Sequence, residues 1–185
     1  MNVVTERLIL RDFKNSDWED LHELYMKPET VKYNPSGYPD NEEASKKIVA
    51  GWSAQPDKAV REEYTAAIIT KTDLKFVGVI SLNLGDRKYR KGEIWYKLHP
   101  DYWGQGLATE ATKAMLAFGF EQLHLHRIEC GCSIHNVASY KVMEKVGMTR
   151  EGIKRKVLPL GNDWHDAYWY AMLEDEYKRS PYYNL

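Results

Sequence analysis

Hydrophobic and polar residues alternate in several short runs of the chain, and in other runs hydrophobic residues recur every three or four positions. The alternating runs, rich in β-branched and aromatic residues, predict strands, whereas the longer spacing predicts amphipathic helices. Strands are predicted over residues 5–13, 64–71, 75–84, 92–100, 126–134, 148–160 and 164–173. Helices are predicted after Asp17 and over about 41–52, 107–123 and 136–147.

Single residues mark the ends of the predicted helices. Asp17 is a candidate N-cap for the first helix, and Pro28 ends that helix because proline cannot continue it. Asn136 is a candidate N-cap for the last predicted helix, and Gly147 is its C-terminal stop. The polar segments "KTDL" and "LGNDW" predict the turns of two hairpins.

The order of these elements is strand, two helices, three strands, helix, strand, helix and two strands. A helix joins the strand that ends at His99 to the strand that starts near His126, and such a crossover makes the two strands parallel. The prediction is therefore an α+β fold: a mixed, mostly antiparallel sheet of about seven strands with a central parallel pair, flanked by about four helices. The length of 185 residues, without repeats, predicts a single domain over 1–185.

Composition and charge narrow the functional classes. Hydrophobic residues make up 43% and charged residues 29%, which excludes disordered, collagen-like and coiled-coil classes. The net charge of -1, from 26 basic and 27 acidic residues, indicates no bulk attraction to nucleic acid or to an anionic membrane. No apolar run has the length of a signal peptide or a membrane span, so a cytoplasmic location is predicted.

The cysteines and histidines predict no metal or redox chemistry. Cys130 and Cys132 lie one residue apart in a predicted strand, too far from each other for an unstrained disulfide, and are expected to be buried free thiols. The histidines lack the spacing of metal ligands.

The segment "YWGQGLATEA", residues 102–111, places two glycines where a strand turns into a helix. The first amides of a helix have no internal acceptors, and Gly104 and Gly106 would let an anion approach them closely. The pattern therefore predicts a pyrophosphate held by backbone rather than by Lys or Arg side chains. A simple tight turn is the alternative. The dinucleotide-binding fingerprint is a weaker alternative. Glu129 lies near the place where that motif has its ribose-binding acid, but Thr109 occupies the place of the motif's third glycine.

Four segments resemble, in order and over about the whole chain, the GNAT N-acetyltransferases, and most of all their RimJ/RimL-like type. These segments are "TERLILRDF", "EIWYKLHPDYWGQGLATEA", "HRIECGCSIHNVASYKVMEKVGM" and "GIKRKVLPLGNDWHDAYWYAML". The resemblance implies a GNAT fold in which the strand before the glycine loop is bulged and splayed from its parallel neighbour. It also implies acetyl-CoA as cofactor and direct transfer of the acetyl group to a primary amine in a ternary complex.

The resemblance also implies site residues. Backbone amides of Gln105 through Thr109 would hold the pyrophosphate, the N–H near Leu98 would polarise the thioester carbonyl, and Ser139 would bind the sulfur and donate its proton. The cofactor-binding residues so implied are Leu98, His99, Trp103, Gly104, Gln105, Gly106, Leu107, Ala108, Thr109, Asn136 and Ser139. The catalytic residues are Ser139, through its hydroxyl, and Leu98, through its backbone. Helix capping by Asn136 and core packing by the Leu98 side chain are the structural alternatives.

Two proton-transfer groups of the family are absent from this chain. Met143 stands where many members carry a tyrosine that acts as the general acid. Leu158 stands where RimL-type relatives carry a carboxylate. The general base is left open between Glu93, Glu129 and a water chain, since an α-amino group with a pKa near 8 needs little help. Tyr140 is expected to pack rather than to act as the acid.

The acceptor is the least determined part of the function. Asp163, His165 and Asp166, with Trp164, are hypothesised to line its pocket. A peptide N-terminus is the expectation of the RimJ/RimL-like type, and polyamines, aminoglycosides and other small amines are alternatives. A catalytically silent CoA-binding module and a nicotinamide-dependent reductase are the rival functions. Whether the chain forms a homodimer is open.

Overall fold

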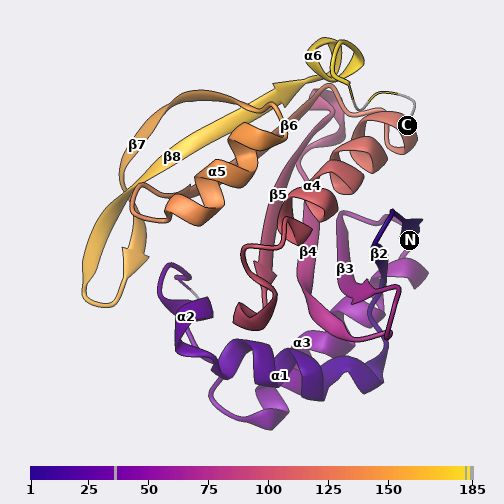
Figure 1. Cartoon of the computed structure of the whole chain (residues 1–185), viewed down its shortest axis with the longest axis vertical. Helices are drawn as coiled ribbons and strands as arrows, with labels where there is room; N and C mark the ends of the chain where they lie inside the picture. The colour runs from indigo at the N-terminus through magenta and orange to yellow at the C-terminus, as the bar shows by residue number, and fades with distance from the viewer. Residues whose placement is uncertain (36, 182, 184–185) are drawn as a thin grey trace.

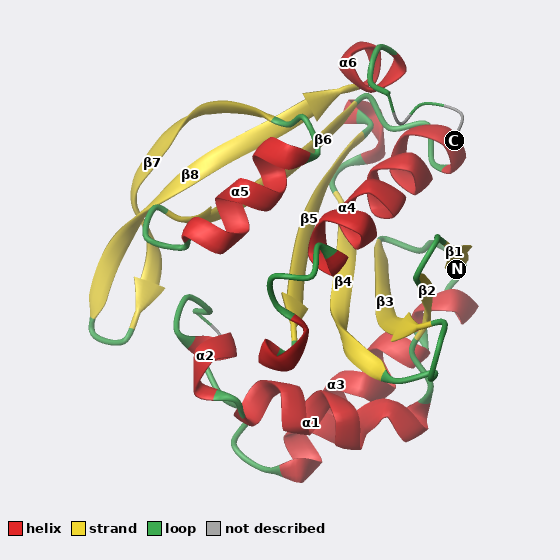
Figure 2. Cartoon of the chain, in the orientation of Figure 1, coloured by secondary structure: helices red, strands yellow, loops and turns green. Residues whose placement is uncertain are grey.

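Residues 1–35, 37–181 and 183 are described by a computed structural model (Figures 1 and 2). Over these residues the fold is one eight-stranded sheet with helices on both faces. The strands are β1 (Asn2–Val4), β2 (Leu8–Asp12), β3 (Glu63–Thr70), β4 (Phe76–Leu84), β5 (Lys91–Leu98), β6 (Arg127–Ser133), β7 (Thr149–Leu160) and β8 (Asp163–Leu173). The helices are α1 (Trp18–Met26), α2 (Pro28–Val31), α3 (Glu42–Ser53), α4 (Leu107–Ala117), α5 (Val137–Lys145) and α6 (Glu174–Lys178).

The strand order β1-β2-β3-β4-β5-β6-β8-β7 confirms the predicted mixed α+β class. Every neighbouring pair is antiparallel except β5 and β6, which confirms the predicted central parallel pair. The strand β1 was not predicted, because three residues are too few to show an alternating pattern. The predicted helix to about Leu123 divides into α4 and a π-helical turn, Phe118–Gln122.

Each face of the sheet buries its own hydrophobic core. Ile80, Ile94 and Met115 belong to the core beneath α4 and α5, whereas Leu21 and Val49 belong to the core beneath α1 and α3. Successive residues of a strand point to opposite faces, so β4 and β5 supply both cores. Full burial of each such side chain stabilises the fold by about 1.5–3 kcal/mol.

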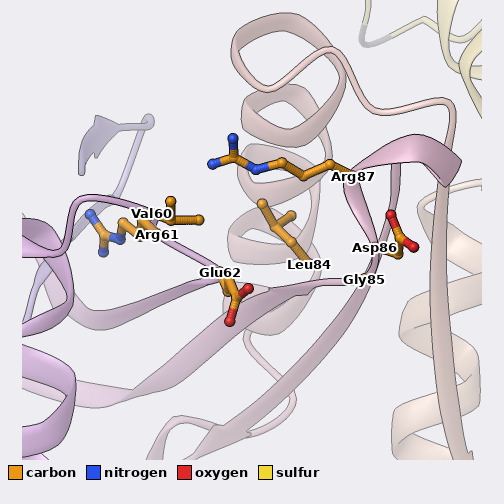
Figure 3. Close-up of a pocket in the computed structure, with 7 residues that line it drawn as sticks. All are labelled: Val60, Arg61, Glu62, Leu84, Gly85, Asp86 and Arg87. Carbon is orange, nitrogen blue, oxygen red and sulfur yellow. The ribbon is translucent and has the colours of Figure 1, made fainter.

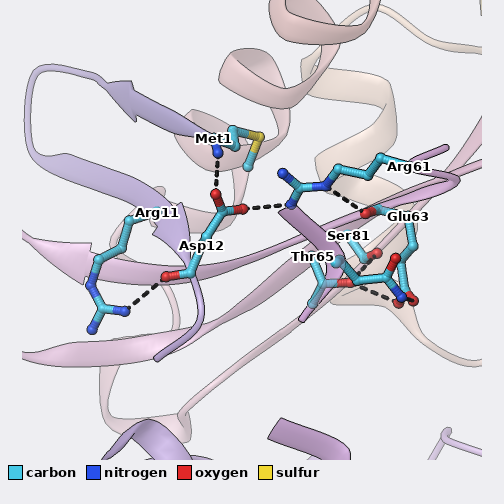
Figure 4. Close-up of polar contacts among 8 residues, drawn as sticks. Met1, Arg11, Asp12, Arg61, Glu63, Thr65 and Ser81 are labelled. Atoms are coloured by element: carbon cyan, nitrogen blue, oxygen red, sulfur yellow. Dashed lines mark hydrogen bonds and ion pairs between the residues drawn. The ribbon is translucent and has the colours of Figure 1, made fainter. Parts of the chain in front are cut away.

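A polar network ties the strands at the β2 end of the sheet together (Figure 4). The Asp12 carboxylate accepts hydrogen bonds from Arg61 and from the Met1 ammonium. The hydroxyls of Thr65 and Ser81, on β3 and β4, lie 2.7 Å apart in the interior. Buried polar groups stabilise a fold when they are paired in this way, and these bonds therefore fix the first strands relative to the centre of the sheet.

The helix-end predictions have different outcomes. Asn136 does cap α5, because its side-chain oxygen accepts from the Ser139 amide at 3.2 Å. The capping prediction for Asp17 is wrong: its carboxylate accepts from the Lys14 amide at 2.8 Å and from Arg11, and none of the α1 amides donates to it. The reason is the 3-10 turn Asn15–Asp17, which lies directly before α1 and turns the carboxylate back toward β2.

Cys130 and Cys132 are both free and buried, as expected. Within the described ranges, none of the helices has the length and apolar character needed to cross a membrane.

Candidate active site

The parallel strands β5 and β6 separate along their length. They pair only from Lys91 to Glu93 of β5, opposite Arg127 to Glu129 of β6. Beyond these residues β5 stays with β4 as far as Leu98, and β6 stays with β8 as far as Ser133 (Figure 1). The result is a gap between the two strands, which is the splay that the sequence resemblance implied.

The expected bulge in β5 is not found. The register between β4 and β5 runs without a shift from Gly78 opposite Leu98 to Leu84 opposite Gly92. The splay instead arises because each strand of the pair follows its antiparallel neighbour, β4 or β8, over a longer stretch than it follows its parallel partner.

The backbone of Leu98 faces the gap. The His99 amide donates to the Val77 carbonyl of β4 at 2.9 Å. Adjacent residues of a strand direct their backbone groups to opposite sides, so the Leu98 amide and carbonyl point away from β4. The carbonyl accepts from the Trp103 indole at 2.8 Å, while the side chain lies in the core. This geometry leaves the Leu98 amide directed toward the gap and shows that its core packing does not conflict with a backbone role.

His99 has fewer free hydrogen-bonding groups for a cofactor than Leu98 has. Its amide is used by β4, its carbonyl accepts from the Tyr102 amide at 3.0 Å, and its Nδ1 accepts from the Asp101 amide at 3.3 Å. These bonds stabilise the 3-10 turn Pro100–Tyr102, which leads into the glycine loop. The expected role of His99 in cofactor binding stays a prediction, and its geometry favours a structural contribution.

The glycine loop presents unpaired amides at the start of α4. Gly104 and Gly106 adopt φ values of 74° and 79°, which disfavour residues with a side chain. The first intrahelical bond runs from the Glu110 amide to the Gly106 carbonyl, so the amides of Leu107 through Thr109 have no acceptor within the helix. Together with the positive end of the helix dipole, these donors have the arrangement that anions prefer, and the anion site stays a prediction.

Arg7 also reaches this loop, which the sequence did not predict. Its Nη1 donates to the Gln105 carbonyl at 2.9 Å, and its Nε donates to Glu110 at 2.6 Å. Nearly half of the Arg7 side chain is exposed, so its positive charge lies at the mouth of the anion site. Arg7 and Gln105 are 98 residues apart in the chain, and hydrophobic patterning gives no sign of such a contact.

The N-terminal turn of α5 lies against β5 through two hydroxyls. The Tyr96 hydroxyl is 3.1 Å from the Ser139 Oγ and donates to the Ser139 carbonyl, also at 3.1 Å. Burial raises the pKa of the Tyr96 hydroxyl well above its usual range, so this group keeps its proton at neutral pH. Burial also raises the pKa of the Cys132 thiol to about 11, although a hydrogen bond from Ser139 opposes the shift. Tyr96 is thus a proton-bearing group at this site that the sequence reasoning missed.

The two carboxylates left open as bases differ in their surroundings. Burial raises the pKa of Glu129, but hydrogen bonding and charge from Arg127, 2.7 Å away, outweigh it and hold that pKa below its usual range. Burial and the charge of Glu129 raise the pKa of Glu93. Glu93 is therefore the better proton acceptor of the two, but it lies in the last paired position, at the closed end of the gap.

The proposed acceptor-pocket residues lie in the β7–β8 hairpin and bond within it. The Asp166 carboxylate accepts from the Lys156 amide at 2.9 Å, and the Asp163 carboxylate accepts from the Trp164 amide at 2.7 Å. Trp164 is exposed, at 54% of its surface. The Asp166 bond lies at the bulge between Lys154 and Leu158, and the Asp163 bond lies beside the hairpin turn. The two aspartates therefore have a structural role whether or not they touch an acceptor.

A separate surface depression of about 560 Å³ lies at the other end of β4 (Figure 3). Its lining residues are Val60, Arg61, Glu62, Leu84, Gly85, Asp86 and Arg87. Leu84 pairs with Gly92, at the opposite end of the β4–β5 ladder from Leu98. This depression is therefore not part of the site formed by the gap and the glycine loop.

Comparison with known proteins agrees with this geometry. The pattern of the acetyltransferase (GNAT) domain matches residues 7–149. The uncharacterized N-acetyltransferase YnaD of Bacillus subtilis (strain 168) is 34% identical over 178 residues, which are 96% of this chain and 99% of that protein.

Solved structures have the same fold. An acetyltransferase (GNAT family) from Bacillus anthracis superposes with a TM-score of 0.84 at 36% identity, covering 95% of this chain and 100% of its own. RimL, a ribosomal L7/L12 alpha-N-protein acetyltransferase solved in complex with CoA, superposes with a TM-score of 0.83 and covers 95% of this chain and 99% of its own. Its identity of 24% supports a common fold and nothing finer.

Proposed function

Because the chain belongs to the GNAT acetyltransferase family, we propose that it transfers an acetyl group directly to the N-terminal α-amine of a peptide within a ternary complex. Members of this family are N-acetyltransferases that use acetyl-CoA. The observation that carries the proposal is the gap between β5 and β6, with the Leu98 amide directed into it and the unpaired amides of α4 at its side.

The residues of the site fit acetyl-CoA. The amides of Gln105 to Thr109 would hold its diphosphate, with Gly104 and Gly106 leaving room and Arg7 adding a positive charge. Trp103 would position the Leu98 carbonyl through its indole, and Asn136 would act through the helix end that it caps. When bound, acetyl-CoA supplies a thioester, an acyl group that an amine can attack.

The Leu98 amide is suited to stabilise the charge of the reacting carbonyl oxygen. An N–H donor fixed in advance toward developing negative charge contributes about 100-fold to 1,000-fold in rate. The indole bond to the Leu98 carbonyl and the ladder to β4 hold this peptide in place. The function therefore rests on the backbone of Leu98, as the sequence resemblance implied.

Proton delivery to the leaving thiolate is assigned to Ser139 with Tyr96. Transfer forms a C–N bond and breaks the C–S bond, so the sulfur must gain a proton and the amine must lose one. Ser139 Oγ is within hydrogen-bonding distance of the Tyr96 hydroxyl, which can replace a proton that Ser139 gives to the sulfur. The proton that the acceptor nitrogen loses on becoming an amide then restores Tyr96 through solvent. This pair stands in for the tyrosine that is absent at Met143, a fully buried core residue.

Direct transfer is favoured over a covalent acetyl-enzyme. A thiol attacks as its thiolate, and burial raises the pKa of both cysteine thiols, that of Cys132 to about 11. Neither Cys130 nor Cys132 is therefore an activated nucleophile.

The charge of the hairpin supports a peptide acceptor over a polyamine or an aminoglycoside. β7 carries four exposed cationic side chains and one exposed carboxylate, namely Arg150, Lys154, Arg155 and Lys156 with Glu151. The hairpin's other carboxylates, Asp163 and Asp166 on β8, accept from backbone amides of the hairpin, and the cations still outnumber the three carboxylates. Like charges repel a polycationic acceptor, whereas a peptide with acidic residues after its N-terminus would be attracted.

Release of free thiol from acetyl-CoA tests the proposal. The acceptors are a peptide with a free N-terminus followed by acidic residues, the same peptide with a blocked N-terminus, spermidine and an aminoglycoside. We expect turnover with the free peptide and acetylation of its α-amine by mass spectrometry. Faster turnover of spermidine would overturn the acceptor assignment, and CoA binding without any turnover would favour a silent CoA-binding module.

The cellular compartment and the assembly are also proposals. The buried free thiols Cys130 and Cys132 are typical of a reducing compartment, which supports the cytoplasm. The homodimer stays a prediction that sedimentation of the purified chain tests.

A further inference from the structure

Lys97 places an unpaired amine inside the protein. Its Nζ is shielded from solvent, and among the residues that the structure describes it has no hydrogen-bond partner. The contact it makes is with the ring face of Tyr25 in α1, 3.6 Å from Nζ to the ring centroid. A buried ammonium without a partner is costly, so such a residue calls for an explanation.

The position of Lys97 ties it to the candidate active site. It lies between Tyr96, which contacts Ser139, and Leu98, whose amide faces the gap. It is four residues beyond Glu93, the last residue of β5 that pairs with β6. Because successive side chains alternate, Tyr96 and Leu98 point toward the core under α4 and α5, and Lys97 points to the opposite face.

The surroundings of Lys97 favour its neutral form. Burial lowers the pKa of the Lys97 ammonium to about 7. Its partner on β4, Val79, is apolar, and its contact on α1, Tyr25, keeps its proton because burial raises the Tyr25 pKa to about 12. The nearby carboxylate Glu23 lies toward Lys27 and His99 instead. Within the described residues, no carboxylate forms a salt bridge with Lys97.

We propose that Lys97 accepts the proton of the incoming ammonium, so that the acceptor attacks as a neutral amine. This inference rests on the proposed function, which leaves the general base unassigned, and it assigns that base to Lys97. The acceptor R–NH3⁺ and the Lys97 amine become R–NH2 and the Lys97 ammonium. R–NH2 then forms the C–N bond as the C–S bond breaks, and the proton that the nitrogen loses on becoming an amide balances the proton that the sulfur gains. Lys97 later returns its own proton to water.

The Lys97 ammonium and the ammonium of an α-amino acceptor have similar pKa values. An α-amino group has a pKa of about 7.7–8.0, so transfer of its proton to Lys97 is close to balanced near neutral pH. The step requires that the acceptor enter the gap from the α1 face, where the flexible four-carbon stem can carry the amine from Tyr25 to it, directly or through one water. The Tyr25 ring face stabilises the ammonium that forms.

Glu93 is a poorer candidate for this step. It lies on the same face of β5, but about 13 Å along the strand from Lys97, at the closed end of the gap. Glu129 is held as an ion by Arg127.

A titration followed by NMR tests the state of Lys97 directly. In protein labelled with ¹³C and ¹⁵N in lysine, the ¹³Cε signal that is lost in Lys97→Met should titrate near pH 7. An ordinary lysine ammonium titrates at about pH 10.4, so the Lys97 signal should stand apart. A Lys97 signal that titrates with the others would overturn the proposal, without any bearing on whether the protein is an acetyltransferase.

Kinetics with the free-N-terminus peptide test the role. Lys97→Met and Lys97→Arg should both lower kcat/KM by about 100-fold or more and remove the rise of the rate near pH 7. Arginine keeps the charge but cannot accept a proton, so a rate preserved in Lys97→Arg would point to charge pairing and refute the proposal. Lys91→Met, an exposed lysine of the same strand, should stay within about threefold of the unaltered protein. A loss of activity in Glu93→Gln with full activity in Lys97→Met would assign the base to Glu93 and refute the proposal.

Folding and cofactor binding serve as controls for these variants. Lys97→Met replaces a buried amine that has no hydrogen-bond partner among the described residues and should be at least as stable as the unaltered protein, with CoA affinity within about threefold by calorimetry. Turnover by the unaltered protein together with an active Lys97→Met would reject this inference alone. Absence of turnover in the unaltered protein would reject both this inference and the proposed function.

Discussion

Arg7 donates from its Nε to the Glu110 carboxylate at 2.6 Å and so joins the segment before β2 to the first turn of α4. The same carboxylate accepts from the Thr5 hydroxyl at 2.6 Å and from the Arg7 amide at 2.8 Å. Partial burial raises the pKa of Glu110, but these hydrogen bonds outweigh it and hold the pKa below its usual range. The ion pair fixes the Arg7 guanidinium where its Nη1 also binds the glycine loop.

Replacement of Arg7 by Met should weaken CoA binding by about threefold to tenfold, because a positive charge and an anchor of the loop are lost together. The measurement is calorimetry of CoA binding at low and moderate salt, with a smaller difference expected at moderate salt. Arg87→Met, an exposed arginine at the far end of β4, is the control and should bind CoA normally. Equal affinities of the two variants would contradict a role for Arg7 in the anion site.

Replacement of Gly106 by Ala should cost about 1 kcal/mol of unfolding free energy and also weaken CoA binding. The backbone there has a φ of 79°, which a residue with a Cβ adopts only with strain. Gly51→Ala is the matched control, since Gly51 lies inside α3 with open space around its Cβ position. That variant should gain about 0.5–1 kcal/mol and leave CoA binding unchanged. Urea unfolding and calorimetry measure the two effects, and unaltered binding by Gly106→Ala would argue against the backbone cradle.

Replacement of Tyr96 by Phe should lower kcat by about 10-fold to 100-fold, because Ser139 loses the group that restores its proton. Stability should fall by only about 1 kcal/mol, the usual value of one hydrogen bond. Tyr140→Phe is the control, because the Tyr140 ring packs edge-to-face on Tyr168, with centroids 5.6 Å apart. If Ser139→Ala lowers kcat while Tyr96→Phe does not, Ser139 acts without Tyr96.

Replacement of Asp12 by Asn should remove part of the acid sensitivity of the fold. Burial raises the pKa of Asp12, but the hydrogen bond from Arg61 and the other charges around it outweigh burial, and the folded-state pKa is lowered. A lowered pKa means that this stabilisation is present above the unfolded value of about 4 and is lost as the pH falls through the folded value.

The measurement for Asp12 is the free energy of unfolding in urea between about pH 3 and pH 7. Asp12→Asn should be less stable near neutral pH by about 1–3 kcal/mol and should lose less stability on acidification. Asp57→Asn, at an exposed position, is the control. A parallel pH dependence of Asp12→Asn and the unaltered protein would contradict the assignment.

The sequence by itself determined the order of the main elements and the glycine turn at the start of α4, on which the proposed anion site depends. Alternation and helical spacing act over a few residues, and the long strands and helices therefore matched their predicted ranges closely. Gly104, Gly106 and the Asn136 cap were predictable for the same reason, since a turn, a helix start and a cap are formed by residues close in the chain.

Sequence patterns gave wrong predictions where a residue outside the predicted element competes for a carboxylate or for a strand edge. The Asp17 carboxylate faces Arg11 of β2 rather than the amides of α1. The parting of β5 and β6 occurs without a bulge, because β4 and β8 hold the two strands over longer stretches. A sequence pattern does not show which of two partners a strand or a carboxylate follows.

Only the tertiary structure decided which side chains surround the site. Arg7 meets Glu110 across 103 residues of chain, and Tyr96 meets Ser139 across 43. In the sequence Lys97 is one polar residue in a strand. The packing of α1 against that face of the sheet buries its amine, which has no hydrogen-bond partner in the part of the chain that the structure describes. Burial and charge depend on every element that packs nearby, and the chemistry of these groups therefore appears only when the chain is folded.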